Sequence, residues 1–352
     1  MSRMRSEDGV MMNINLYDDQ GFINVPAIAA RPTWLKVLIG ARQVGKTYGV
    51  LRYHLQNNIP FILLRRTTEE LKFIGNNSAL DPFQVFVPEY RTRLQATGGS
   101  FSIMDYDAEG NAIAGSQRGI ALSLPQISHI RGFSGAAYQS IVFDEAIPEK
   151  SVRTLKTEGD ALLNAYTTIN GNRELFGKPP ITLWLLANSN NINSRILDSL
   201  NLTDDIIRMQ SRGLEYFEKP GVSIFHGASR KITQLRKDTA LAKLIDADSE
   251  FAGMAFDNEW SYDESPLIKV RNIKHMTPVC SYDDEFYIWE DAAGLYVCEA
   301  PHKVERYGGS SFETSQFTAN YLWLKRYYLE GLVTFSNIKL LAVFKRLFEL
   351  DY

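Results

Sequence analysis

The chain has 352 residues and a net charge of −3, with 45% apolar and 12% aromatic residues. Because this length is large for one hydrophobic core, we expect two domains and a connector. No run of about 18 apolar residues occurs, and the first residues lack the apolar segment of a secretory signal, which argues against a membrane span or a secreted protein. The slightly acidic charge excludes a globally basic nucleic-acid binder, so any contact with DNA must use local basic patches.

A phosphate-binding loop follows the polar, irregular lead-in of residues 1–30. Residues 40–47 fit the pattern G-x-x-x-x-G-K-[ST], between a buried apolar stretch (Trp34–Ile39) and a predicted helix (Tyr48–Gln56). Such loops turn their backbone N–H groups toward a triphosphate at the amino end of a helix. A chance match in a glycine-bearing turn is the alternative. The predicted nucleotide-binding residues are Gly40, Ala41, Arg42, Gln43, Val44, Gly45, Lys46, Thr47 and Tyr48.

Two side chains of this loop have predicted chemical roles. Lys46 is expected to reach the β- and γ-phosphates and to serve catalysis, and the Thr47 hydroxyl is expected to ligate Mg²⁺. The predicted cofactors are therefore ATP and Mg²⁺.

The stretch from Leu35 to about His226 alternates short apolar runs with amphipathic segments, which is typical of an α/β fold. Between the second and third expected strands, the segment Phe101–Met104 and a turn at Glu109–Asn111 predict a hairpin at the edge of the sheet. The expected strands are Leu35–Ile39, Phe61–Leu64, Ala121–Leu124, Ser140–Phe143, Ile181–Ala187 and Val222–Phe225.

An acidic pair, Asp144 and Glu145, directly follows the predicted strand Ser140–Phe143. In a P-loop fold, we expect the strand beside the phosphate loop to end in an Asp that holds Mg²⁺ through water. An adjacent Glu can polarise the attacking water as general base. We predict these roles for Asp144 and Glu145; the alternative is that both acids only cap the following helix.

A third polar motif ends the apolar stretch Leu183–Ala187, where Asn188, Ser189 and Asn190 follow. An amide can donate to a phosphate oxygen and accept from water, so Asn188 is predicted to sense the γ-phosphate and the attacking water. A turn-forming asparagine cluster is the alternative. The order of the three motifs favours the sensor role.

The composition changes after residue 228. Residues Arg230–Asp246 predict one amphipathic helix with five basic residues against two acids. Beyond it we expect a small α+β unit with strands at Leu267–Val270, Glu285–Trp289, Gly294–Cys298 and Leu332–Phe335 and helices at Thr318–Leu329 and Ile338–Leu350. The predicted domains are thus 1–228, a linker at 229–260, and 261–352.

The two cysteines, Cys280 and Cys298, have neither the close spacing nor the histidine neighbours of a metal site. A cytosolic chain would rarely keep a disulfide, so we expect two buried free thiols.

With the three motifs in this order, the chain resembles the viral double-stranded-DNA packaging ATPases, a large-terminase-like class of additional-strand P-loop NTPases. Ile130–Phe133 is similar to the R-G element that precedes the acidic motif in that class. The encapsidation ATPases of phi-twenty-nine-type phages are particularly similar. The stretches that carry this likeness are Ile39–Tyr48, Arg65-Arg66, Ile141–Glu145, Leu162–Asn164 and Asn172–Glu174, with a fainter echo at Leu244–Asp246 and Phe256–Asn258.

The resemblance implies an α/β fold with a RecA-like P-loop core, a helical linker and a small RNase H-like domain. It also implies an ATPase that drives double-stranded DNA into a procapsid, as a homomeric ring, with five subunits expected, on the portal. The setting would be the host cytoplasm, transiently at the portal vertex, and a structural packaging RNA would be a further partner.

The resemblance further implies that the last domain has lost nuclease activity. A two-metal nuclease needs carboxylates that converge from separate strands. The C-terminal acids instead cluster along one predicted hairpin, which is more typical of a solvated face. These acids are Asp283, Asp284, Glu285, Glu290 and Asp291.

Ring ATPases usually supply an arginine in trans to the neighbour's γ-phosphate. The phi-twenty-nine-type pattern has two arginines in this stretch, whereas here the first position is Gly171 and Arg173 remains. Arg173 is therefore the predicted trans arginine, although a surface arginine in a loop is the alternative. Arg42, acting in cis, and Arg131 are further candidates.

Non-specific binding of DNA would use contacts to its phosphates. Basic residues of the connector helix and of the C-terminal helices are candidate contacts, although such runs are usually solvated. Those of the C-terminal helices are Lys325, Arg326, Lys339, Lys345 and Arg346. Two rival functions remain open at this point: a helicase or DNA-repair ATPase, and a nucleotide-regulated assembly protein without translocation.

Overall fold

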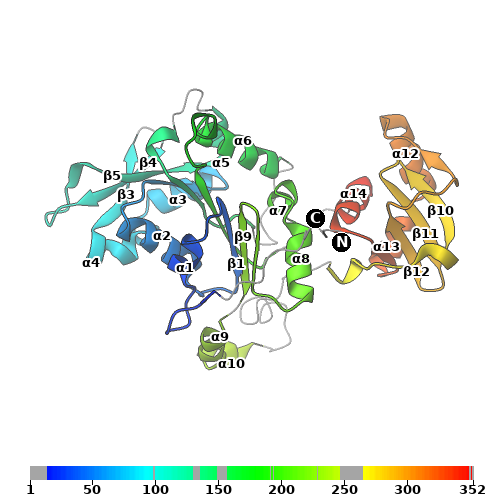
Figure 1. Cartoon of the computed structure of the whole chain (residues 1–352), viewed down its shortest axis with the longest axis horizontal. Helices are drawn as coiled ribbons and strands as arrows, with labels where there is room; N and C mark the ends of the chain where they lie inside the picture. The colour runs from blue at the N-terminus through cyan, green and yellow to red at the C-terminus, as the bar shows by residue number, and fades with distance from the viewer. Residues whose placement is uncertain are drawn as a thin grey trace, which may run out of the picture. The chain divides into compact units, whose positions relative to one another are not determined.

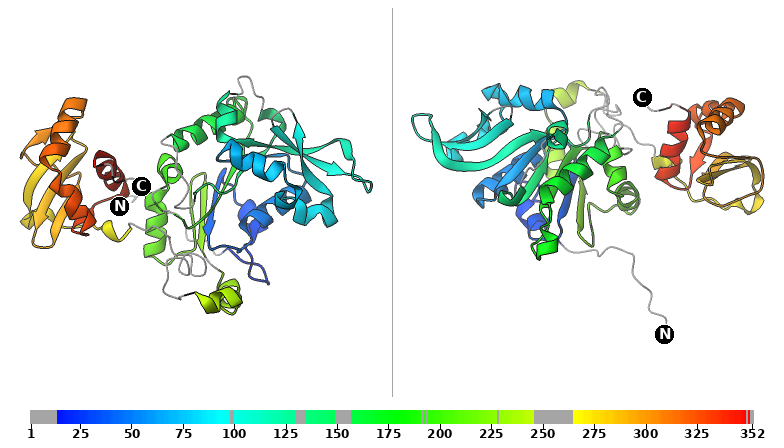
Figure 2. Two further views of the ribbon diagram at one scale, coloured as in Figure 1. Left: turned by 180° about the vertical axis from the view of Figure 1, so that it is seen from behind. Right: turned by 90° about the horizontal axis from the view of Figure 1, so that it is seen from above.

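The computed structural model describes residues 14–97, 100–129, 135–148, 157–190, 192, 194–227, 229–245, 265–348 and 350. The chain divides into two compact units, Met1–Leu200 with Arg208–Tyr262 and Asn201–Ile207 with Asp263–Tyr352. Figures 1 and 2 show their elements. In the described part of the chain, no helix combines the length and the apolar character that a bilayer crossing requires.

A nine-stranded sheet, in the order β3-β4-β5-β2-β6-β7-β1-β9-β8, forms the centre of the first unit. From β5 to β9 all neighbouring strands are parallel, and antiparallel strands extend both edges. The strands are β1 Leu35–Gly40, β2 Phe61–Arg65, β3 Thr92–Thr97, β4 Ser100–Tyr106, β5 Ala112–Ser123, β6 Ser140–Phe143, β7 Thr182–Asn188, β8 Tyr216–Lys219 and β9 Val222–Gly227.

The predicted strands of this unit are found, and Ser140–Phe143 has the predicted bounds. The predicted hairpin is confirmed as β4 and β5, which carry β3 at one edge of the sheet and extend away from it in Figure 1. The strand that precedes Asp144, β6, does not lie directly beside β1, because β7 pairs with both β1 and β6. This interposed β7 is the additional strand that the fold class implies.

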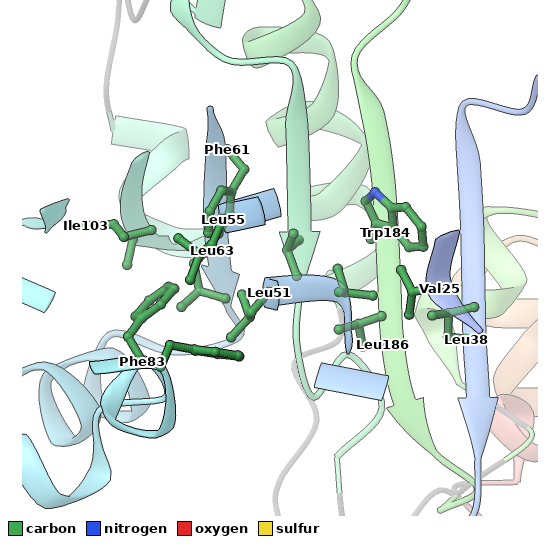
Figure 3. Packing of buried hydrophobic residues seen from close by; sticks show 14 of the residues in the cluster. Val25, Leu38, Leu51, Leu55, Phe61, Leu63, Phe83, Ile103, Trp184 and Leu186 are labelled. Carbon is green, nitrogen blue, oxygen red and sulfur yellow. The ribbon is translucent and has the colours of Figure 1, made fainter. Parts of the chain in front are cut away.

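Helices cover both faces of this sheet. Because side chains alternate along a strand, Leu38, Trp184 and Leu186 face α1 and α2, whereas Val37 and Leu185 face the other side, and all are buried. Figure 3 shows the first of these layers, with Leu51 and Leu55 of α2 packed on the strands. The helices of the unit are α1 Val25–Ala29, α2 Lys46–Gln56, α3 Thr68–Gly75, α4 Val87–Tyr90, α5 Leu124–His129, α6 Glu158–Asn170, α7 Arg195–Ser199, α9 Arg230–Lys237 and α10 Ala240–Leu244. The helix α8, Thr203–Ser211, is divided between the units after Ile207.

The single helix expected from Arg230 to Asp246 is instead two helices, α9 and α10. The break lies at Asp238–Thr239, where the Thr239 hydroxyl donates to the Arg236 carbonyl and accepts from the N–H of Ala242 at 3.4 Å. A threonine that binds the backbone in this way begins a new helix rather than continuing the old one. Asp246 and the remainder of the predicted linker up to 260 lie outside the described residues.

The second unit contains a five-stranded sheet in the order β13-β10-β11-β12-β14, covered by α12 Ser311–Asn320, α13 Trp323–Leu329 and α14 Ile338–Leu347. Its strands are β10 Thr277–Tyr282, β11 Phe286–Asp291, β12 Gly294–Cys298, β13 Arg306–Tyr307 and β14 Val333–Phe335. The strand β12 has the predicted bounds. Cys280 and Cys298 are buried free thiols, which confirms that prediction.

Two predictions for this unit were wrong. The segment Leu267–Val270 does not form a strand, because it makes only an isolated bridge, from Ile268 to Phe335 of the edge strand β14, and Val270 is 93% exposed. The helix expected over Thr318–Leu329 is divided into α12 and α13, because Tyr321 leaves the helical conformation at the end of α12.

Charged residues of the second unit bear on two further expectations. Asp284 pairs with Arg306, and Asp291 lies 2.5 Å from Arg271. These acids are therefore compensated within the unit. Lys345 is buried at 6% exposure, so it is removed from the candidate contacts for nucleic acid.

Candidate functional site

The carboxyl ends of the parallel strands β1, β6 and β7 bring three sequence motifs together. The phosphate loop follows β1, the acidic pair follows β6, and Asn188 ends β7. Because ligands bind at the carboxyl ends of parallel strands, this edge is where a site is expected. A cavity of about 210 Å³ opens there. Lys46, Thr47, Asp144, Glu145 and Asn188 all line it.

The backbone of the phosphate loop has the wrapped conformation that its glycines predicted. Gln43 and Gly45 have φ values of 64° and 88°, in the left-handed region, and α2 begins at Lys46. At Gly40, an added Cβ would lie 2.5 Å from the carbonyl oxygen of Gly227 in β9. The loop thus needs glycine at its first position for close strand packing and at Gly45 for the backbone turn.

Lys46 lines the cavity and is buried, at 7% exposure. Its Nζ donates to the carbonyl oxygens of Gly40 and Ala41, both at 2.8 Å, and to Oδ1 of Asn188 at 3.1 Å. Burial lowers the pKa of Lys46 to about 7, and the charge of Asp144 opposes this shift. A buried cation whose hydrogen bonds go to the neutral oxygens of Gly40, Ala41 and Asn188 is well suited to receive a polyphosphate.

The Thr47 hydroxyl donates to Oδ1 of Asp144 at 2.8 Å. A hydroxyl and a carboxylate at this spacing are the donor set that holds Mg²⁺ in P-loop sites, so the two residues predicted for the metal lie together and fit it. When bound there, the ion would neutralise negative charge on the phosphates.

Glu145 adopts a φ of 54°, which is strained for a residue with a side chain. Its carboxylate is largely exposed and lies 3.1 Å from Nη1 of Arg65. This backbone conformation, just after the end of β6, accompanies a carboxylate that lines the cavity. A general base at this position could accept a proton from water.

Arg65 is a site residue to which the motifs assigned no role. It ends β2, and its guanidinium lies 3.1 Å from Asp144 as well as 3.1 Å from Glu145. The neighbouring Arg66 is also buried and donates to Glu158 at 2.9 Å from Nε. Two charged residues that directly follow an apolar strand were a visible signal, since the strand places them at the same edge as the acidic pair.

Arg173 does not join the cavity of its own chain. Its guanidinium donates to the carbonyl oxygens of Pro179 and Tyr138, both at 3.1 Å, near the amino ends of β7 and β6. It therefore holds a loop at the opposite end of these strands from the phosphate loop. Arg131, in the R-G element, and the Phe256–Asn258 stretch lie outside the described residues.

Two further predicted loop residues, Tyr48 and Arg42, flank Lys46 and Thr47 in the chain and contact other elements. Tyr48 is 47% exposed and its ring is stacked on Phe86, with centroids 4.9 Å apart. The Arg42 carbonyl accepts a hydrogen bond from Nη1 of Arg236 at 2.8 Å. The residue His226, on β9, was not among the predicted site residues. Its burial, together with the charge of Lys46, lowers its pKa to about 4, so its imidazole is neutral at pH 7.

The sheet order, the phosphate loop and the acidic pair define the class: this is an additional-strand P-loop ATPase. The chain belongs to the family of podovirus DNA encapsidation proteins (Gp16), whose model matches residues 17–330. It is thus an ATPase of the phage DNA-packaging motor.

Two solved phage structures have the same fold. The chain shares 16% identity with the Phi-28 gp11 DNA packaging motor, with a TM-score of 0.60 over 95% of this chain and 99% of that one. With the bacteriophage Phi-29 viral genome packaging motor assembly it shares 20% identity, with a TM-score of 0.62 over 93% of this chain and 98% of that one. A search of curated protein sequences found no match.

Proposed function

We propose that the cavity binds Mg-ATP and that its hydrolysis moves double-stranded DNA into a procapsid. The observation that carries this proposal is the convergence of Lys46, the acidic pair and Asn188 on one cavity. Family membership supplies the encapsidation context.

Each residue then has an assigned task. Lys46 leaves the carbonyls of Gly40 and Ala41 to contact the phosphates, and Thr47 and Asp144 hold the metal. Glu145 takes a proton from the attacking water, and Asn188 contacts the γ-phosphate and that water. Arg65 can stay beside Oε2 of Glu145 during this step, since the carboxylate has a second oxygen, Oε1, that can accept from the water.

The assembly is a homomeric ring, with five subunits expected, on the portal of the procapsid in the host cytoplasm, with a packaging RNA as a further partner. The two motor-like relatives support a ring. Arg173 is proposed as the trans arginine; its two carbonyl contacts would then have to be exchanged for the neighbour's phosphate.

The decisive experiment measures phosphate release with and without duplex DNA, beside the oligomeric mass at two salt concentrations. A motor should be stimulated by duplex, Lys46→Ala should abolish turnover, and Glu145→Gln should bind ATP but hydrolyse it at least about 100-fold more slowly. Strand displacement or stimulation by single strands alone would instead indicate a helicase. Normal assembly and function of the Lys46→Ala variant would indicate a scaffold.

A further inference from the structure

The carbonyl oxygens of the phosphate loop need partners of their own. The carbonyls of Gly40 and Ala41 accept from Lys46, and the later loop carbonyls need partners elsewhere, because buried carbonyls are normally hydrogen-bonded. The Val44 carbonyl accepts from the N–H of Ile23 at 2.9 Å. The Arg42 carbonyl accepts from Nη1 of Arg236 at 2.8 Å. Arg236 thus reaches the loop from α9, far along the chain.

The helix that carries Arg236 is itself firmly attached. The Ser229 hydroxyl caps it by accepting from the N–H of Ile232 at 3.3 Å, and the Ile232 side chain is buried. One position before Ile232, Lys231 Nζ donates to the carbonyl of Asp19 at 2.7 Å, in the segment that leads into α1. These contacts fix the position of α9, and therefore the position of Arg236 relative to the loop.

The charges around this contact favour an anion. Burial lowers the pKa of Arg236, and the neighbouring charge of Arg42 lowers it further. Both arginines also lower the pKa of Lys46. The mutual repulsion of these three cations, Lys46, Arg42 and Arg236, decreases when a polyphosphate binds between them.

We propose that Arg236 is a positioning residue of the ATP site, which holds the Arg42 peptide in the orientation that a bound polyphosphate requires. This inference rests on the nucleotide site proposed above. Without the contact, the Arg42 peptide can rotate, and only a fraction of the loops remains able to bind, which reduces the apparent affinity by that fraction. Because the loop amides surround the β-phosphate, which ATP and ADP share, both nucleotides should lose affinity by the same factor.

The test compares three variants of the full chain: Arg236→Gln, Arg236→Lys, and Arg212→Gln, an exposed arginine after α8. Fluorescent mant-ATP and mant-ADP are titrated into each, and thermal melting monitors folding. Loss of a charge-assisted hydrogen bond predicts an increase of about tenfold in both Kd values for Arg236→Gln. Arg236→Lys should increase both Kd values by about threefold, because an ammonium group lacks the planar set of donors of a guanidinium. Arg212→Gln should match the wild type.

Three results would overturn the proposal: unchanged Kd values in Arg236→Gln, a loss confined to mant-ATP, which would indicate a γ-phosphate contact, or an equal loss in Arg212→Gln. If Arg236→Gln does not fold, Arg236→Lys decides, since a Kd equal to that of the wild type would also refute the positioning role. Failure of the wild type to bind either nucleotide would refute the nucleotide site itself, a separate result.

Discussion

Arg65 places one positive charge beside two carboxylates that line the cavity, and its side chain and that of Asp144 are only 8% and 7% exposed. Removing one partner of such a buried pair leaves an uncompensated charge. We expect Arg65→Met to lower the free energy of unfolding by about 3 kcal/mol. Saturating Mg-ATP should recover part of this loss, because the metal ion then lies beside Asp144.

Thermal and urea unfolding with and without Mg-ATP measures both effects. The matched control is Arg52→Met, since Arg52 and Glu89 form an exposed pair with 46% and 49% exposure, and it should change stability by less than about 0.5 kcal/mol. Equal losses in the two variants would show that the buried contact of Arg65 has no special role.

Lys46 makes nucleotide binding dependent on pH. Its pKa of about 7 in the free protein results first from burial, while Asp144 raises it and Arg42 and Arg236 lower it. Polyphosphate favours the ammonium, so at pH 8 binding should take up about one proton, whereas at pH 6 Lys46 is already charged and little is taken up. Calorimetry in buffers with different ionisation enthalpies measures this uptake. Equal uptake at both pH values would contradict the assignment.

The same shift affects stability. Between about pH 7 and the ordinary pKa of 10.5, the unfolded chain binds a proton at Lys46 that the folded chain does not. The contribution of Lys46 to the free energy of unfolding therefore rises with pH in this window. His226 adds no pH dependence in this window, because its folded pKa of about 4 and its ordinary pKa of 6.5 both lie below pH 7.

At the scale of elements, the junction of β1 and β9 determines where the phosphate loop begins. Gly40 and Gly227 are register partners, and a Cβ on Gly40 would meet the Gly227 carbonyl at 2.5 Å. Gly40→Ala should therefore separate the strands, lower the free energy of unfolding by about 2–3 kcal/mol and weaken ATP binding.

Gly177→Ala is the matched control, because Gly177 has open space around its Cα and a φ of 68°. Its cost should be about 1 kcal/mol, from backbone strain alone, with no change in ATP affinity. Urea unfolding and nucleotide titration compare the two variants. If Gly40→Ala were no worse than Gly177→Ala, close strand packing would not explain the glycine.

The elements that were predicted well are those with a strong local signal. The strand Ser140–Phe143 is a short apolar run that ends in charged residues, and the whole run is buried. The linker helix was predicted as too long because its amphipathic period continues past Thr239, and the cap at that residue depends on which carbonyl its hydroxyl meets. The hydrophobic periodicity of a sequence indicates which face of a helix is buried, whereas the point at which a helix breaks depends on single hydrogen bonds.

At the scale of the whole molecule, the residues that line the cavity belong to the first unit. A fragment of residues 1–262 should therefore bind Mg-ATP with a Kd within about twofold of that of the full chain. Because Asn201–Ile207 belongs to the second unit, the fragment leaves Ile207 without its packing partners. An Ile207→Ser change in the fragment should therefore improve its solubility. Nucleotide titration of both fragments checks the predicted Kd, and the concentration that each fragment reaches in solution checks the predicted solubility. A Kd more than about tenfold higher in both would show that the second unit contributes to the site.

The sequence by itself determined the phosphate loop, the acidic pair, the α/β core and the order of its motifs, because each of these depends on residues that are neighbours in the chain. The tertiary structure decided which distant side chains act on them. It placed β7 between β1 and β6, set Arg65 against both carboxylates, and engaged Arg173 with carbonyls away from the cavity. Long-range pairings of this kind follow from strand order and packing, which no local pattern encodes.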